Sequence, residues 1–146
     1  MYHNNLKRLR NEQELTQKEV AKILNCNRNT YNNWEQGVVM IPLDIADKLS
    51  CFYKVSLSCI YGIENDFSTK ENIKPINYET MLDNLMKLKK QNKHTYKIIA
   101  KALNCTEPTV QRYFTGVIVP PSDRLVLLTK LYNIDLDSLC GKNKEL

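Results

Sequence analysis

The chain has 146 residues, of which 42% are hydrophobic and 25% are charged, and this composition is typical of folded globular proteins. It contains no apolar run of the length that a membrane-spanning helix needs, about 18 residues. The N-terminal residues lack the apolar stretch of a secretory signal, so we expect a cytoplasmic protein. Five cysteines without a CxxC pair predict free thiols rather than a disulfide framework.

The net charge of +5 is unevenly placed. Residues 1–66 carry eight basic and eight acidic side chains, whereas residues 67–146 carry thirteen and eight, so the whole surplus lies in the second half. A basic half is consistent with a polyanionic partner, although a surplus of this size also occurs on ordinary solvated surfaces.

The chain repeats itself at an offset of 79 positions. Residues 6–62 align with residues 85–141 without a gap, and 18 of these 57 pairs are identical. A gapless match of this extent indicates a duplicated structural unit. We therefore expect an N-terminal domain over residues 1–62 and a C-terminal domain over residues 78–146. The polar residues 63–77 between them are interpreted as a linker.

Helical spacing, capping residues and turn residues in the first repeat predict five short helices in chain order. Leu6 and Leu9 have the three-residue spacing of a helix face, and Thr16 with Glu19 forms a capping-box pattern ahead of the second helix. Asn25 suits the left-handed backbone of a tight turn between helices, and Asn27 suits a helix N-cap. Gly37 ends the third helix, Pro42 opens the fourth, and Ser56 precedes the short fifth.

The second repeat carries corresponding signals, and neither repeat contains a convincing strand. Corresponding turn and cap positions are occupied by Thr95, Asn104, Thr106, Gly116, Pro121 and Asp135. The fold class is therefore predicted to be all-α.

Residues 15–37, LTQKEVAKILNCNRNTYNNWEQG, resemble the helix-turn-helix core of the phage-repressor and Cro-like (Xre-type) family. The matching positions are Leu15-Thr16-Gln17, Val20-Ala21, Asn25-Cys26-Asn27, Tyr31 and Trp34-Glu35-Gln36-Gly37. The resemblance implies two lambda-repressor-like five-helix domains in tandem, in a transcriptional repressor that binds double-stranded DNA. The second repeat keeps this skeleton but replaces Gln17 by Tyr96 and Glu35 by Phe114.

The third helix of the first repeat has two different faces. At about 100° per residue, Arg28, Asn29, Asn32 and Asn33 fall on one side, and Tyr31 and Trp34 on the other. Arginine can donate two hydrogen bonds to guanine, and asparagine can pair bidentately with adenine. An asparagine-rich face can also be merely a solvated surface.

The resemblance assigns roles to these side chains. It implies that Arg28, Asn29 and Asn33 contact bases, and Asn32 is a possible addition. It also implies a phosphate contact by Gln17, and we place Lys18 beside it at the start of the second helix. Trp34 is expected in the core, and Glu35 is expected to be a structural hydrogen-bonding partner.

The second repeat offers a different set of candidates. Its third helix presents Gln111 and Arg112, together with Glu107 and Pro108, which suit the first turn of any helix. Lysines cluster where its first helix ends and its second begins, and phosphate neutralisation by them is an alternative to a plain solvated face. These lysines are Lys89, Lys90, Lys93 and Lys97.

Apolar loops follow the glycine at matching places in both repeats. Such loops are either buried within each domain or form a self-complementary interface, in a homodimer or in a single-chain pseudo-dimer. The interface candidates are Val38, Val39, Met40, Ile41, Val117, Ile118 and Val119.

The sequence also leaves open a function other than DNA binding. The altered second repeat favours, as an alternative, a protein-interaction module such as an antitoxin or a phage-encoded inhibitor. His3 and His94 are the only histidines, and no nucleophile–base spacing, glycine-rich phosphate loop or metal cluster is present. We therefore expect no enzymatic activity, no cofactor or metal, and no small-molecule ligand.

Overall fold

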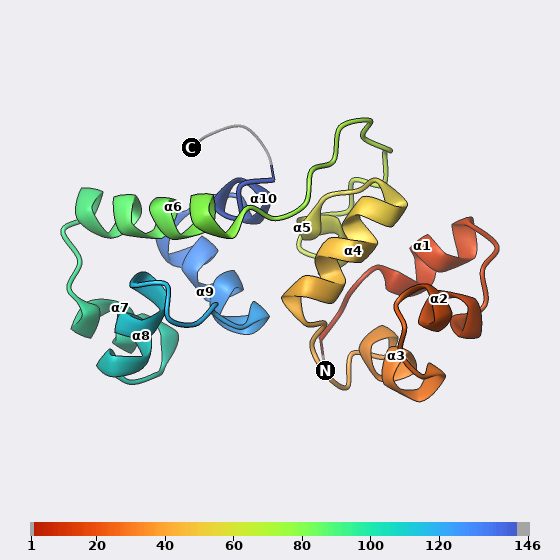
Figure 1. Cartoon of the computed structure of the whole chain (residues 1–146), viewed down its shortest axis with the longest axis horizontal. Coiled ribbons are helices and arrows are strands. Elements are labelled where there is room, and N and C mark those ends of the chain that lie inside the picture. The colour runs from red at the N-terminus through yellow and green to blue at the C-terminus, as the bar shows by residue number, and fades with distance from the viewer. Residues whose placement is uncertain (1, 143–146) are drawn as a thin grey trace. The chain divides into compact units, whose positions relative to one another are not determined.

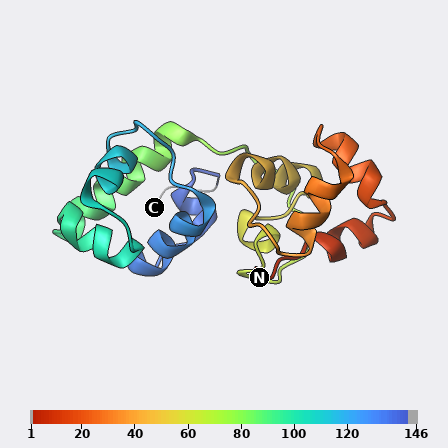
Figure 2. The same ribbon diagram turned by 90° about the horizontal axis from the view of Figure 1, so that it is seen from below.

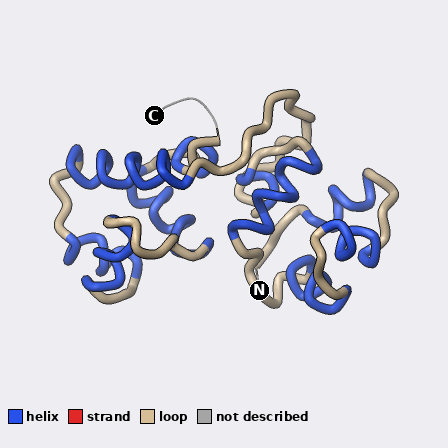
Figure 3. The backbone as a smooth tube through the Cα atoms, in the orientation of Figure 1, coloured by secondary structure: helices blue, strands red, loops and turns tan. Residues whose placement is uncertain are grey.

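The computed structural model describes residues 2–142, which divide into two compact units between Pro75 and Ile76 (Figure 1). Every regular element in this described part is a helix (Figure 3), so the all-α prediction is confirmed. None of these helices is long and apolar enough to cross a membrane.

The first unit contains five helices around one apolar core. They are α1 (Leu6–Glu12), α2 (Gln17–Ile23), α3 (Arg28–Glu35), α4 (Leu43–Tyr53) and α5 (Leu57–Ile60). Helices α2 and α3 pack against each other and form the helix-turn-helix (Figure 1; the turned view is Figure 2). Each helix contributes a fully buried side chain to the core, and these side chains are Leu6, Val20, Tyr31, Leu49 and Leu57.

The second unit repeats this arrangement with one longer helix. Its helices are α6 (Tyr78–Gln91), α7 (Tyr96–Leu103), α8 (Glu107–Phe114), α9 (Ser122–Tyr132) and α10 (Leu136–Leu139). Helix α6 has 14 residues where α1 has 7, because it begins about two helical turns earlier relative to the repeat. The core is again apolar, with Leu85, Ile99, Val110 and Leu128 buried.

The predicted caps form at the helix starts. Thr16 accepts a hydrogen bond from the Glu19 backbone, and the Glu19 carboxylate accepts one from the Thr16 backbone, which completes the capping box. Asn27 caps α3 through the backbone N–H of Thr30. The equivalent caps of the second unit are made by Thr95 and Thr106.

The turn between the two motif helices has the left-handed backbone that the asparagines predicted. Asn25 has a φ of 55° and Asn104 a φ of 54°. Asparagine tolerates this conformation better than most residues because its short polar side chain can bond locally. In both units the helix after the turn packs onto the helix before it.

One equivalence between the repeats extends beyond the aligned range. The amide nitrogen of Asn5 donates to the Cys59 carbonyl at 2.8 Å, and that of Asn84 donates to the Ser138 carbonyl at 3.1 Å. Both pairs of positions differ by 79. Each asparagine therefore ties the first helix of its unit to the last.

Parts of the segment expected to be a linker are built into one unit or the other. The Lys70 backbone donates to the Lys54 carbonyl at 2.9 Å, and the Arg8 guanidinium lies 3.7 Å from the centre of the Phe67 ring. At the other end, Ile76 is buried and Asn77 caps α6. Residues at both ends of the expected linker therefore belong to the units themselves.

Candidate nucleic-acid interface

Helix α3 exposes one polar face and buries an aromatic one. Arg28, Asn29 and Asn33 are exposed, Tyr31 and Trp34 are buried in the core, and Asn32 is half-buried at the edge between the faces. The expected location of Trp34 in the core is confirmed. The candidate base-contacting side chains thus project from a helix that is anchored by its opposite side.

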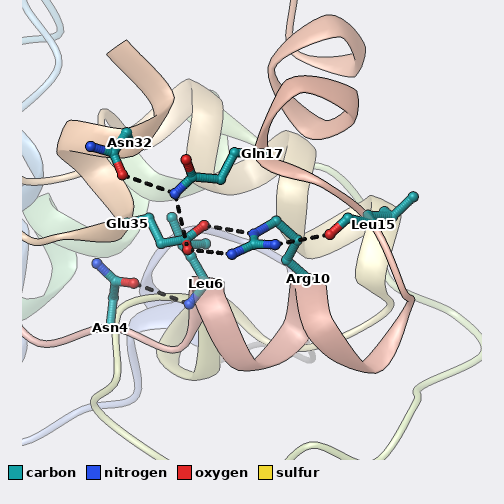
Figure 4. Close-up of polar contacts among 7 residues, drawn as sticks. All are labelled: Asn4, Leu6, Arg10, Leu15, Gln17, Asn32 and Glu35. Atoms are coloured by element: carbon teal, nitrogen blue, oxygen red, sulfur yellow. Dashed lines mark hydrogen bonds and ion pairs between the residues drawn. The ribbon is translucent and has the colours of Figure 1, made fainter. Parts of the chain in front are cut away.

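Beneath this face, three helices meet in a polar network (Figure 4). The Arg10 guanidinium donates two hydrogen bonds to the Glu35 carboxylate, at 2.9 and 2.7 Å, and a third to the Leu15 carbonyl at 2.9 Å. Gln17, at the start of α2, donates from Nε2 to Asn32 Oδ1 at 2.9 Å and to Glu35 Oε1 at 3.3 Å. Glu35 is therefore a structural hydrogen-bonding partner, as expected.

The electrostatics of this network keep Glu35 ionised. Burial by itself raises the pKa of Glu35, but the hydrogen bonds from Arg10 and the other neighbours outweigh it and hold that pKa below its ordinary value. The same bond to Glu35 raises the pKa of Arg10. A bidentate pair of this kind is among the stronger side-chain interactions in proteins.

A surface hollow of about 520 Å³ opens beside the network. Its lining residues are Arg10, Leu15, Thr16, Gln17, Lys18 and Arg28. Lys18 is exposed, and Gln17 is half-buried with its Nε2 already engaged by Asn32 and Glu35. The hollow thus brings the two candidate phosphate contacts together with the first candidate base contact.

In the second unit, aromatic side chains replace this ionic network. Lys89, Tyr96 and Phe114 stand at the positions equivalent to Arg10, Gln17 and Glu35, with an offset of 79 in each case. The Lys89 ammonium lies 4.7 Å from the centre of the Tyr96 ring, and the Tyr96 and Phe114 rings make an edge-to-face contact at 6.3 Å. Cation–π and aromatic contacts therefore tie the same three helices together.

The exposed face of α8 is chemically mixed. Gln111 and Arg112 are exposed, as are Glu107 and Pro108 in its first turn, whereas Val110 and Tyr113 are buried. The hydroxyl of Tyr113 accepts a hydrogen bond of 2.6 Å from Arg124. The candidate contacts of this helix therefore share its surface with a carboxylate.

The lysines of the second unit lie around the junction of α6 and α7. Lys89, Lys90 and Lys93 line a hollow of about 520 Å³ together with Met86, Lys87 and His94, and Lys97 is exposed on α7. Residues 87–101 carry six lysines and no acidic residue, whereas the equivalent residues 8–22 carry four basic and three acidic ones. This junction is therefore much more cationic than its counterpart in the first unit. We call Lys89, Lys90, Lys93 and Lys97 the lysine surface.

The apolar loops divide between core and solvent. Val38 and Val39 are exposed and Met40 is half-buried, but Ile41 is buried in the core of the first unit. Ile41 therefore follows the first of the two alternatives, burial within its own domain, because the chain turns inward there to lead into α4. In the second unit Val117, Ile118 and Val119 are all exposed.

One side chain that organises the interface, Arg10, was not predicted from the sequence. Arg10 lies on the first helix, outside the helix-turn-helix, and its partner is 25 positions away. The helical spacing from Leu6 and Leu9 gave one signal, since it places Arg10 at the edge of the buried face rather than opposite it.

Within the described residues, no group of three or more His, Cys, Asp or Glu side chains could hold a metal ion.

Comparisons with known proteins agree with this architecture. The helix-turn-helix family matches the chain twice, over residues 6–58 and 85–139. The chain therefore belongs to this family, that of the phage-repressor and Cro-like proteins, and carries two copies of its domain in tandem.

The chain is similar to a transcriptional regulator from Listeria innocua, with 30% identity over 45% of this chain and a TM-score of 0.42. The match covers 62% of that regulator, so the chain corresponds to less than two thirds of its length. No curated protein matches the chain.

Proposed function

We propose that the protein is a sequence-specific double-stranded DNA-binding regulator that represses transcription. The observation that carries this proposal is the division of α3: Arg28, Asn29 and Asn33 are exposed while Tyr31 and Trp34 anchor the helix. In a helix-turn-helix this second helix enters the major groove and its N-terminal residues touch base edges. Membership of the family supports this assignment.

In this proposal Arg28 donates to guanine O6 and N7, and Asn29 and Asn33 contact neighbouring bases. Lys18 and Gln17 lie beside Arg28 around one hollow, where a DNA backbone flanking the groove can pass. Because Gln17 Nε2 is taken by Asn32 and Glu35, the phosphate contact assigned to Gln17 is made by its backbone N–H at the start of α2. Phosphate contacts there set the register of the helix, and the base contacts give the sequence preference.

The lysine surface of the second unit adds affinity without sequence preference. Six lysines and no acidic residue over residues 87–101 favour binding to phosphates by counterion release. Gln111 and Arg112 on α8 are the candidates for any base contact there, although Glu107 beside them disfavours a close approach to phosphates. The second repeat therefore strengthens binding more than it selects a sequence.

The exposed loop residues Val38 and Val39, with Val117, Ile118 and Val119, form the proposed contact between repeats. Such contacts arise within one chain, as a pseudo-dimer, or between two chains. Light scattering combined with footprinting tests this. A monomer that protects two half-sites indicates the first arrangement and a dimer the second, whereas a dimer unaffected by Val39→Lys contradicts both.

Selection of bound sequences from a random pool of duplex DNA tests the main proposal. We expect one preferred motif, and Arg28→Ala is expected to weaken binding to it by about 1–3 kcal/mol and to relax one position. Lys22→Ala, an exposed residue of α2, is the control. If Arg28→Ala leaves DNA binding intact while binding of a protein partner is lost, the protein-interaction function holds instead.

A further inference from the structure

The polar network beneath α3 gives the Asn32 amide a single orientation. The network begins at the Glu35 carboxylate, which Arg10 keeps ionised through two hydrogen bonds. An ionised carboxylate accepts hydrogen bonds and cannot donate them. Whatever side-chain amide approaches it must therefore present its nitrogen.

Gln17 is the amide that approaches. Its Nε2 lies 3.3 Å from Glu35 Oε1, and the reversed orientation would place two acceptor oxygens against each other. The same Nε2 donates to Asn32 Oδ1 at 2.9 Å. The direction of donation is thus passed from the ion pair through Gln17 to Asn32.

The hydrogen bonds from Arg10 to Glu35, and from Gln17 to Glu35 and Asn32, form a relay. Its consequence is the direction in which the Asn32 nitrogen points. Because Asn32 Oδ1 is turned to Gln17, its Nδ2 points away from Gln17, as Figure 4 shows. Asn32 is half-buried beside exposed Arg28 and Asn33, so this nitrogen is the polar group that it offers to a ligand in front of α3. Bidentate pairing of an asparagine with adenine needs both the oxygen and the nitrogen on the base.

We infer that Asn32 contacts DNA as a hydrogen-bond donor only, and that the Arg10–Glu35–Gln17 relay sets this polarity. The inference rests on the proposed function of α3. A donor fits the major-groove edges of guanine, which offers O6 and N7, and of thymine, which offers O4. Adenine offers it N7 alone, in a single hydrogen bond, and the amino group of cytosine offers it no acceptor. Asn32 thus disfavours cytosine at one operator position, with Arg10, Glu35 and Gln17 as positioning residues.

The first test exchanges the hydrogen-bond donor that Asn32 presents for an acceptor. Asn32→Asp keeps an oxygen for Gln17 but turns a second acceptor outward. In selection from a random duplex pool, we expect cytosine, which the unaltered protein disfavours, to become accepted at one position of the motif, with a preference change of about fivefold, the size of one hydrogen bond. Gln36→Glu adds an equal charge at the exposed end of α3 and is expected to lower affinity without moving any preference.

A second variant tests the relay without adding charge. Gln17→Met removes the donor to Asn32, whose amide is then free to turn, and we expect the same operator position to accept all four bases more evenly. Circular dichroism confirms that each variant is folded. A loss of affinity that is equal for every sequence in both variants would assign Asn32 to a phosphate and overturn the inference.

The experiments distinguish a failure of the role inferred for Asn32 from a failure of the proposed DNA-binding function. If the unaltered protein selects a motif and neither variant changes a preference within it, the donor-only role of Asn32 is wrong and the DNA-binding function stands. If the unaltered protein selects no motif at all, sequence-specific binding is wrong and the inference fails with it.

Discussion

The guanidinium of Arg10 and the carboxylate of Glu35 face each other with two hydrogen bonds, joining the first helix of the chain to the end of the candidate recognition helix. Glu35 is 1% exposed and Arg10 13% exposed in their side chains. The pair thus lies directly beneath the proposed DNA-facing surface. It orients Gln17 and holds α3 against α1 at the same time.

Removing one partner of this pair should destabilise the first unit strongly. Arg10→Met leaves the Glu35 carboxylate buried without its partner, and the expected decrease is about 3–5 kcal/mol in the free energy of unfolding. Trp34, which precedes Glu35 in the chain, is buried and is the only tryptophan, so its fluorescence reports on this unit. The double variant Arg10→Met with Glu35→Leu should recover much of the stability, and a double variant as unstable as the single one would contradict this account.

The same pair makes the first unit sensitive to acid. The pKa of Glu35 is lower in the folded state than the roughly 4.3 of an unfolded chain, so the folded state binds the proton less readily. Its stabilising contribution is fully present above the unfolded value and is lost as the pH falls through the folded pKa. Denaturant midpoints followed by Trp34 fluorescence should therefore drop more steeply with acid in the unaltered protein than in Glu35→Gln. Parallel pH profiles would show that Glu35 is not responsible.

The lysine surface should control the salt dependence of DNA binding. Lys90→Gln and Lys93→Gln are each expected to weaken binding to preferred and unrelated duplexes alike, because each removes a positive charge that can neutralise a phosphate. Removal of one such charge should reduce the magnitude of the slope of log K against log salt by about 0.9. Fluorescence anisotropy over a salt series measures this slope. Lys130→Gln, an exposed position on α9 outside the surface, is the matched control, and an unchanged slope in both surface variants would mean that the lysines are merely solvated.

Equivalent glycines of the two repeats should respond differently to alanine. Gly37 has a φ of 74°, and an added Cβ would lie 2.1 Å from the Tyr2 carbonyl oxygen; Gly116 has a φ of 80°, and its nearest neighbour is the Leu82 side chain at 2.9 Å. Both variants carry the left-handed backbone cost of about 1–2 kcal/mol. Gly37→Ala should lose more stability than this, because a backbone atom must move. Thermal unfolding by circular dichroism compares them, and equal decreases would refute the role of the Tyr2 contact.

The local features of each repeat were predictable because they depend on residues close in the chain. The capping box of Thr16 and Glu19 spans one helical turn, and the left-handed turn at Asn25 depends on a single residue type. The burial of Tyr31 and Trp34 follows from helical periodicity alone. The repeat itself needed only a comparison of the chain with its own second half.

What the sequence determined by itself was therefore the helices, their caps and turns, the duplication and the polar side of α3. Only the tertiary structure decided that Arg10 reaches Glu35 across 25 positions, that Ile41 turns into the core while Val38 stays outside, and that Phe67 and Lys70 pack back on the first unit. Helical periodicity and capping act over three or four residues. Which distant side chains meet is set by how whole helices pack, and this is why the orientation of Asn32 could not be read from its neighbours in the chain.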